Sequence, residues 1–507
     1  MNIKTGSYSA ACKLWITIFF TVSIAACSSS DEEDGNGFLK FYNASANAPA
    51  IYITIDEDLD EDEDGEVEQT YSNISYGRAL SNQEVPTGDY FYELAWQDED
   101  SNARSDLEIV FEDSLSVETD EITLVVMTDD VLNPDVTIFN VPIVDDEDDT
   151  DDDLFNLRFL NLTPLDTAID IYMSKSDETF NESEFMGSFS YLELSDNIKR
   201  EEDQYTFYIT LAGSDEVLFE SAEVSYPFSS QYIIAVRPSE GAGESPFVID
   251  NIGNTTIAEY QASDAEARFQ IYNGMQLNDL LPEYDGELNV NADIETSEPQ
   301  TIISNLAMGD ISQSFTVENG DYSLSLSNAS SSVNLLQSQL LSLPENTDRT
   351  VFYYLIEEYA DEDGDGDFDE DGDGVIDEIE VKITASVVNN STRERIYDHE
   401  VKMLNLAYSN DFSRVTFYFV KSDEIIETAD NRRATTIGNP ESLVLLNNTY
   451  EVYAIAEIDG NEIILDKFDL SLNEESDELY LILEENPSSG TGYAMKVFPQ
   501  ISSTPSN

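Results

Sequence analysis

Ser72-Asn-Ile-Ser-Tyr-Gly77, followed by Val85-Pro-Thr-Gly-Asp-Tyr90, is the stretch of sequence that decides the fold. It returns as Ser304-Asn-Leu-Ala-Met-Gly309, followed by Val317-Glu-Asn-Gly-Asp-Tyr322. In both copies eleven positions separate the two glycines, and an alternating apolar and polar segment follows. Because glycine adopts positive φ without steric cost, each copy predicts a turn that leads into a half-buried strand. Repetition at a fixed spacing indicates a chain built from similar modules.

The chain has 507 residues, which is too many for one hydrophobic core. Four segments open with a strand pattern that ends in an asparagine and continue with short runs of β-branched and aromatic residues. Such strands, separated by turn signals, predict an all-β chain of tandem antiparallel β-sandwich modules, similar to immunoglobulin or transthyretin domains. The predicted modules cover residues 38–144, 155–262, 266–398 and 401–499.

Two segments depart from the strand pattern. Residues 145–154 are the predicted linker between the first two modules, because the run Asp145–Asp153 carries like charges that cannot pack. Helical periodicity is nearly absent, and the best candidate for a helix is Val333 to Leu341, with one or two turns.

The N-terminus has the pattern of a lipoprotein signal peptide, predicted to cover residues 1–26. Its apolar run, Leu14 to Ile24, is too short to span a bilayer as a mature helix. It ends in Ile24-Ala-Ala-Cys27, which resembles the bacterial lipobox, and the resemblance implies cleavage before Cys27 and a lipid anchor on its sulfur. Residues 27–37 then form an acidic tether. An ordinary secretory signal with a chance cysteine is the alternative.

The charge of the chain limits its partners. There are 106 acidic residues against 22 basic ones, for a net charge of −84. This balance argues against nucleic acid and against electrostatic docking on anionic lipids, so the lipid anchor is the expected contact with the membrane. The only other cysteine, Cys12, lies in the signal peptide, so the mature chain is expected to form no disulfide within itself.

The turn motifs carry a family resemblance. The opening Asn43-Ala-Ser-Ala-Asn-Ala-Pro49, the middle Ser-Asn-x-x-x-Gly and the later Gly-Asp-Tyr resemble the bacterial family called domain of unknown function 4397. The first module matches from Phe38 to about Leu94, the second keeps its opening and Asp170-Ile-Tyr172, and the fourth is the most diverged. The resemblance implies β domains associated with the cell envelope, and it supplies no catalytic residue.

One acidic loop has the spacing of a calcium site. From Asp369 the sequence fits a twelve-residue EF-hand loop, in which Gly374 makes the turn and Glu380 closes the site. An overlapping copy begins at Asp361, and strand-like flanks make the pair more similar to extracellular calcium repeats than to paired EF-hands. The predicted ligands are Asp361, Asp363, Asp365, Asp369, Asp371, Asp373, the carbonyl of Val375, Asp377 and Glu380. The alternative is a solvated acidic loop without a bound ion.

A weaker relative of this loop lies at residues 56–68. Its candidate ligands are Asp60, Asp62, Asp64 and Glu68. Tyr71 stands where the closing glutamate should be, so calcium and a solvated loop are equally good interpretations here.

The sequence offers little material for an enzyme. His399 is the only histidine, and its polar surroundings predict a side chain that faces solvent. Dinucleotide, phosphate-loop and nucleophile-elbow motifs are all absent from the sequence. We therefore expect a non-enzymatic, adhesin-like binding or structural protein, stabilised by Ca²⁺ and anchored in the outer membrane, with the exposed cell surface favoured over the periplasmic face. Its expected partner is a surface glycan or a protein. A carbohydrate-binding or scavenging lipoprotein is the second interpretation, and a glycosidase the third.

The calcium hypothesis gives the first testable prediction. The carboxylates of residues 361–380 repel one another when the loop is empty, and a divalent ion removes that repulsion. Extracellular sites bind Ca²⁺ with a Kd on the order of 10⁻⁴–10⁻³ M, and saturation at about 100 times Kd adds roughly 2.7 kcal/mol to stability. Calorimetric titration and melting of the chain from residue 37 onward should show this gain. Asp373→Ala with Glu380→Ala should remove most of it, whereas Glu370→Ala should not. Melting that is unaffected by calcium in the unmodified chain would contradict the prediction.

Overall fold

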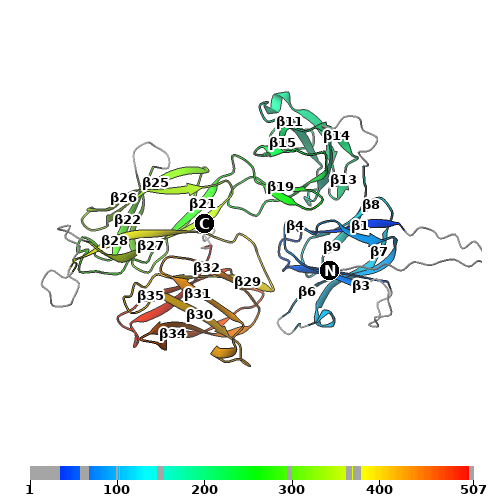
Figure 1. Cartoon of the computed structure of the whole chain (residues 1–507). Helices are drawn as coiled ribbons and strands as arrows, with labels where there is room; N and C mark the ends of the chain where they lie inside the picture. The colour runs from blue at the N-terminus through cyan, green and yellow to red at the C-terminus, as the bar shows by residue number, and fades with distance from the viewer. Residues whose placement is uncertain are drawn as a thin grey trace, which may run out of the picture.

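The computed structural model describes residues 35–57, 68–98, 101, 103–144, 154–293, 300–360, 368 and 378–501. These residues form eight β-sheets that pack in four pairs, and each pair encloses one hydrophobic core. We call the pairs modules 1 to 4 in chain order (Figure 1). No helix in the described part of the chain has the length and hydropathy that a membrane crossing needs.

Modules 1 and 2 form the N-terminal half of the structure. The strands of module 1 are β1 (Asn36–Asn43), β2 (Ile51–Asp56), β3 (Glu68–Ile74), β4 (Arg78–Ala79), β5 (Gln83–Pro86), β6 (Gly88–Trp96), β7 (Glu108–Val117), β8 (Glu121–Thr128) and β9 (Asp135–Pro142), with the short 3₁₀ helix η1 (Arg104–Asp106). The strands of module 2 are β10 (Leu154–Asn161), β11 (Ile169–Lys175), β12 (Glu184–Phe189), β13 (Glu193–Leu194), β14 (Ile198–Glu201), β15 (Gln204–Leu211), β16 (Phe219–Glu220), β17 (Val224–Ser225), β18 (Gln231–Pro238), β19 (Phe247–Ile252) and β20 (Ile257–Tyr260), with η3 (Phe180–Glu182).

Modules 3 and 4 form the C-terminal half. The strands of module 3 are β21 (Ala267–Asn273), β22 (Glu287–Ala292), β23 (Gln300–Ala307), β24 (Phe315–Val317), β25 (Gly320–Asn328), β26 (Asn334–Leu343), β27 (Asp348–Tyr359) and β28 (Ile379–Asn389). The strands of module 4 are β29 (Asp398–Asn405), β30 (Arg414–Val420), β31 (Asn431–Thr436), β32 (Glu441–Leu446), β33 (Thr449–Ile458), β34 (Asn461–Ser471), β35 (Leu479–Glu485) and β36 (Tyr493–Pro499), with η4 (Ile426–Thr428).

The predicted all-β sandwich fold is confirmed, with one addition. The sheets are antiparallel except that the first strand of each module pairs in parallel with a later strand: β1 with β8, β10 with β18, β21 with β27 and β29 with β35. A parallel pair needs a long crossover, which the second sheet of the module supplies. Each module therefore closes on itself, because its first strand lies beside one of its last.

The repeated glycine has a defined backbone role. The asparagine that ends the first strand accepts, through its main-chain carbonyl, an N–H bond from a residue with positive φ. The donors are Gly77, Leu192, Gly309 and Gly438, with φ of 67°, 59°, 78° and 71°. The sequence motif identified two of these turns. It missed Gly438, and it missed module 2, where a leucine occupies the left-handed conformation that favours glycine.

The tyrosine of the Gly-Asp-Tyr motif makes a second bond, and an equivalent tyrosine makes the same bond in modules 2 and 4, which lack the motif. The tyrosine hydroxyl donates to the carbonyl of the residue four positions earlier: Tyr90 to Pro86, Tyr205 to Glu201, Tyr322 to Glu318 and Tyr450 to Leu446. The same arrangement, known as a tyrosine corner, fixes the chain where it enters a strand in other β-sandwiches. In each module this corner holds the start of β6, β15, β25 or β33.

The predicted helix at Val333 to Leu341 is wrong. All of these residues except Val333 belong to β26, which pairs with β25. Leu341 and Leu343 are buried, whereas Leu340 is exposed and Ser342 is half-buried, so burial follows the period of two of an edge strand. Leucine is a good helix former, and here the pairing with β25 overrides its preference.

The predicted exposure of His399 is also wrong. Strand β29 begins at Asp398, before the predicted start of module 4, and it includes this histidine. The side chain is fully buried, and its Nε2 lies 2.8 Å from Oδ1 of Asn447. The polar residues around His399 in the sequence point away from it because neighbours alternate between the two faces of a strand.

Modules 1 and 2 are joined by a shared apolar layer. Tyr42, Leu124 and Val126 of module 1 pack against residues such as Leu160 and Ala235 of module 2. The layer also contains charge, since the buried hydroxyl of Tyr42 donates to Asp250, whose carboxylate accepts from Nε of Arg237 at 2.7 Å. Burial without such partners would be costly for each of these groups.

Modules 3 and 4 are joined in the same manner. Tyr272, Phe352 and Tyr480 are buried in the layer between them. The hydroxyl of Tyr272 donates to Glu484 at 2.6 Å, and Nζ of Lys496 lies 2.9 Å from the other oxygen of that carboxylate. Both halves of the chain therefore use a buried tyrosine that donates to an acid of the next module.

The two halves contact each other in two places, between modules 1 and 4 and between modules 2 and 3 (Figure 1). Between modules 1 and 4, the rings of Trp96 and Tyr397 stack with centroids 4.4 Å apart, and Arg393 donates to the carbonyl of Ala48 at 2.9 Å. Between modules 2 and 3, Nδ2 of Asn346 donates to Oε1 of Gln261 at 2.6 Å. Each module thus contacts two others, and the four modules close into a ring.

The tyrosine corner gives a stability prediction. Tyr450→Phe removes a hydroxyl that donates to a main-chain carbonyl at 2.9 Å without changing the packing of the ring. We expect a loss of about 1 kcal/mol in the unfolding of module 4, measured by denaturant titration. Tyr418→Phe, whose side chain lies on the outer face of the same sheet, is the matched control and should change stability by less than about 0.5 kcal/mol. Equal effects of the two substitutions would contradict the role of the corner.

Candidate functional site

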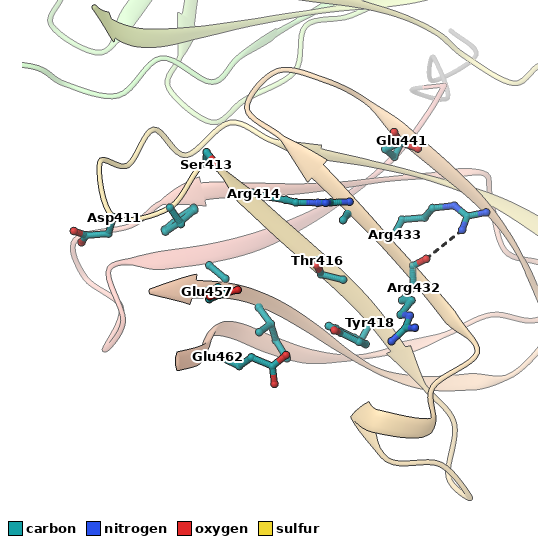
Figure 2. A pocket seen from close by; sticks show the side chains of 14 residues that line it. Asp411, Ser413, Arg414, Thr416, Tyr418, Arg432, Arg433, Glu441, Glu457 and Glu462 are labelled. Atoms are coloured by element: carbon teal, nitrogen blue, oxygen red, sulfur yellow. Dashed lines mark hydrogen bonds between the residues drawn. The ribbon is translucent and has the colours of Figure 1, made fainter. Parts of the chain in front are cut away.

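A large hollow lies on the outer face of module 4. It has a volume of about 1080 Å³ and lies on the sheet with strand order β31-β30-β33-β34 (Figure 2). Its floor is a row of side chains without charge that crosses the strands: Ala434 pairs with Thr416, and Thr416 pairs with Ile455. We call this hollow the trough.

Long side chains form the two walls of the trough. On one side, Tyr418 pairs with Arg432 and Tyr453. On the other side stand Arg414 and Glu457, and Glu457 pairs with Glu462 across the β33–β34 hairpin. The trough exists because the period of two brings the short side chains into one row and the long ones into the rows beside it.

The charges in the trough are separated. Arg414 and Arg432 lie on the outer face over β30 and β31, and Arg433 lines the same end from the edge of β31, whereas Glu457 and Glu462 lie over β33 and β34 (Figure 2). Asp411 lines the acidic side, and Glu441 lies beyond the arginines at the rim. Across the row, the trough thus changes from a basic end to an acidic end.

The arginines of the trough lack acidic partners. Within the described residues, Arg414 and Arg432 make no side-chain hydrogen bond and no ion pair. The only side-chain bonds of Arg433 go to the main-chain carbonyls of Ser442 and Arg432, at 3.4 and 3.3 Å. In a chain with 106 acidic residues, exposed guanidinium groups without a carboxylate are available to a ligand.

The corresponding outer face is occupied in modules 1 and 2. In module 1, Arg104 crosses the sheet to pair with three acids, Asp56, Glu68 and Glu93. In module 2, Phe180 of η3 packs against Tyr172 and Tyr208. In module 4, η4 belongs to the connection between β30 and β31, residues 421–430, at the end of these strands. It does not cover the outer face of the sheet, which therefore stays open (Figure 2).

Arg237 shows the contrasting, structural use of arginine. It is buried in module 2 next to module 1, pairs with Asp250 and Glu259, and donates to the hydroxyl of Tyr76 at 2.7 Å. Burial raises the pKa of Asp250, and the charge of Arg237 opposes that rise. We assign these groups to the contact between modules, since their hydrogen bonds are taken up within the protein.

Most of the site residues predicted from the sequence lie outside the described residues. These are Cys27, the calcium candidates from Asp361 to Asp377, and Asp60, Asp62 and Asp64. Glu380 is described, lies in β28 and pairs with Lys382 at 2.9 Å. Glu68 lies in β3 and pairs with Arg104. In the described part of the chain, no three His, Cys, Asp or Glu side chains come together as metal ligands.

The sequence analysis missed the trough. Its signal was present in Arg414, Thr416 and Tyr418, alternate residues of one strand with large, small and large side chains. The pattern becomes a site only through the pairing with β31 and β33, which the sequence does not show.

A family model matches the start of the chain. Residues 37–172 match the domain of unknown function DUF4397. The DUF4397 match covers module 1 and continues into β11 of module 2, which agrees with the resemblance seen in the opening motif. The trough lies outside the DUF4397 match. No curated protein matches the chain.

Several solved structures are distantly similar to the chain. The TIE protein of Bacillus anthracis is 9% identical, with a TM-score of 0.15, and the match covers 89% of this chain and 74% of that one. A putative adhesin from Bacteroides ovatus is 10% identical, with a TM-score of 0.14, over 46% and 98% of the two chains. BcpA, the major pilin subunit of Bacillus cereus, is 10% identical, with a TM-score of 0.13, over 65% and 99%. Likenesses at this level carry no conclusion about function.

Substitution of the buried Arg237 and of the exposed arginines of the trough should affect stability to very different extents. Arg237→Ala leaves Asp250 buried without its cation, so we expect a loss of about 3–5 kcal/mol in the unfolding of modules 1 and 2. Arg414→Ala and Arg432→Ala remove exposed groups without partners and should change stability by less than about 0.5 kcal/mol. Differential scanning calorimetry of the three variants measures both effects. A large loss in either trough variant would show that these arginines support the fold.

Proposed function

We propose that this chain is a non-enzymatic cell-surface binding protein that holds a glycan in the trough of module 4. The observation that carries the proposal is the open row Ala434–Thr416–Ile455 between walls of tyrosine and arginine. Of the interpretations drawn from the sequence, this combines the adhesin-like protein with the carbohydrate-binding one.

The shape of the trough suits an extended, polar ligand. It crosses four strands, and three strand spacings give it a length of roughly 14 Å, enough for a short oligosaccharide. Tyr418 offers a ring face, and Thr416 and Ser413 offer hydroxyl groups. Rings together with hydrogen-bonding groups suit a sugar, which has an apolar face and a rim of hydroxyls.

The carboxylates of the trough favour binding over hydrolysis. A glycosidase needs two carboxyl groups whose environments give one of them the role of acid and the other that of base or nucleophile. Glu457 and Glu462 face each other across an exposed hairpin, and both are open to water. The described structure gives them no differing surroundings that would separate those roles.

The rest of the proposal comes from the sequence. A lipid on Cys27 would anchor the chain in the outer membrane, and residues 27–37 would hold the ring of modules away from the bilayer. Ca²⁺ bound at residues 361–380 would stabilise module 3. Neither the anchor nor the ion contributes a group to the trough.

Filling the trough tests the proposal. Ala434→Tyr places a ring on the floor at an edge strand, where an outward side chain leaves the core unchanged. The soluble chain from residue 37 onward is screened against immobilised neutral and acidic glycans. We expect binding to at least one glycan, and a loss of about tenfold or more in the Ala434→Tyr variant. The matched control is Thr301→Tyr, an exposed position on edge strand β23 of module 3, which should bind as the unmodified chain does.

Two outcomes would contradict the proposal. One is an absence of binding to every glycan on the array. The other is a glycan that binds equally to the unmodified chain and to Ala434→Tyr, because that result would place its site outside the trough.

A further inference from the structure

The trough is electrically asymmetric along its length, and this asymmetry restricts the ligand. Strands β30 and β31 contribute Arg414, Arg432 and Arg433 at one end. Strands β33 and β34 contribute Glu457 and Glu462 at the other (Figure 2). Since both kinds of group line one hollow, a ligand that fills it meets cations over β31 and β30 and carboxylates over the next two strands, β33 and β34.

The basic end is suited to a carboxylate. A guanidinium group binds a carboxylate through two parallel N–H bonds, and such charge-assisted bonds are about twice as strong as neutral ones. Arg414 and Arg432 stand on opposite walls, in the rows on either side of the pair Thr416–Ala434. A carboxylate that lies over this pair can be approached from both walls.

The acidic end is suited to hydroxyl groups and unsuited to a second carboxylate. Ionised Glu457 and Glu462 accept hydrogen bonds but cannot donate them, so sugar hydroxyls are their natural partners. A carboxylate placed there would meet two like charges at contact distance. A uniformly acidic polymer is therefore favoured at the basic end of the trough and disfavoured at the acidic end.

We propose that the trough binds an oligosaccharide that carries a single carboxylate sugar, with the acid over β30 and β31 and neutral sugars over β33 and β34. This inference rests on the proposed function and adds the class and the direction of the ligand. Of the possible occupants, a glycan is favoured over an acidic peptide because the acidic end requires hydroxyl donors.

The net charge of −84 does not oppose this ligand. At physiological ionic strength the Debye length is about 8 Å, so charges elsewhere on the chain are largely screened. The arginines of the trough lie at contact distance from a bound acid, where screening is weak. One carboxylate in the ligand also meets much less long-range repulsion than a polyanion would.

The experiment compares oligosaccharides that carry one uronic acid with their carboxyl-reduced, neutral forms and with oligogalacturonates of the same length. Affinities are measured by calorimetry on the chain from residue 37 onward. The single-acid form should bind about tenfold or more tightly than its reduced form, and more tightly than the oligogalacturonate. Arg414→Gln combined with Arg432→Gln should remove the preference over the reduced form without abolishing the binding of that form. Arg78→Gln, an exposed arginine in module 1, is the control for the change in net charge and should leave the preference intact.

The glutamates are tested in the opposite direction. Glu457→Gln with Glu462→Gln keeps polar groups at the acidic end but removes their repulsion, so the gap between the single-acid form and the oligogalacturonate should narrow. An unchanged gap would overturn the assignment of that end. If polyglutamate at equal carboxylate concentration displaces the bound glycan, the ligand of the trough is an acidic peptide and the proposed glycan ligand is wrong.

The outcomes separate this inference from the proposed function. If neutral glycans bind as well as acidic ones and Ala434→Tyr abolishes both, the trough is a glycan site and the acidic ligand is wrong. If no glycan binds, or if Ala434→Tyr has no effect, both proposals fail.

Discussion

Burial on both faces of the first strand is the constraint on which the rest of the structure depends. Strands β1, β10, β21 and β29 each turn one face to the core of their own module, and the other face to a neighbouring module. A strand buried in this way has few exposed positions, so its sequence is nearly continuous in apolar residues, as in Phe38-Leu-Lys-Phe-Tyr42. The polar side chains that remain must find partners. Lys40, for example, donates to the carbonyl of Gly253 in module 2 at 2.9 Å, and burial lowers its pKa to about 8.

Local sequence predicts the parts of the fold that local geometry determines. The repeated Gly77 and Gly309 have positive φ, and Asn73 and Asn305, each four residues before its glycine, mark shifts in strand register with φ of 64° and 56°. No local sequence pattern predicts the buried contacts between modules. Tyr42 and Tyr272 are followed by asparagine in the sequence like any strand end, and their acidic partners, Asp250 and Glu484, are more than 200 positions away. Separation in sequence also explains the error at His399, whose partner Asn447 is 48 positions away, in the turn between β32 and β33.

In this acidic chain, arginines paired with buried acids and exposed arginines without an acidic partner have different roles. Many carboxylates compete for few cations, and most arginines that form ion pairs hold structure together, as Arg237 and Arg268 do with the buried acids Asp250 and Asp348. An exposed arginine without an acidic neighbour is unusual in such a chain. The trough is a candidate site because it presents two of them, Arg414 and Arg432, on one open face, on either side of the short side chains of Thr416 and Ala434. Composition alone pointed away from anionic ligands, since it averages over the whole surface and misses the arrangement on one sheet.

The shared layers between modules have a consequence for how such a chain can be divided. A single module cut out of the ring would expose the outer face that carries Tyr42, Leu124 and Val126, or Tyr272 and Phe352, and with it a buried acid that has lost its donor. The smallest piece that keeps these faces covered is a pair of consecutive modules. Duplication, exchange or loss of segments in a chain of this kind is therefore expected to involve pairs of consecutive modules. The segment that is gained or lost as a whole is then twice as long as the sequence repeat.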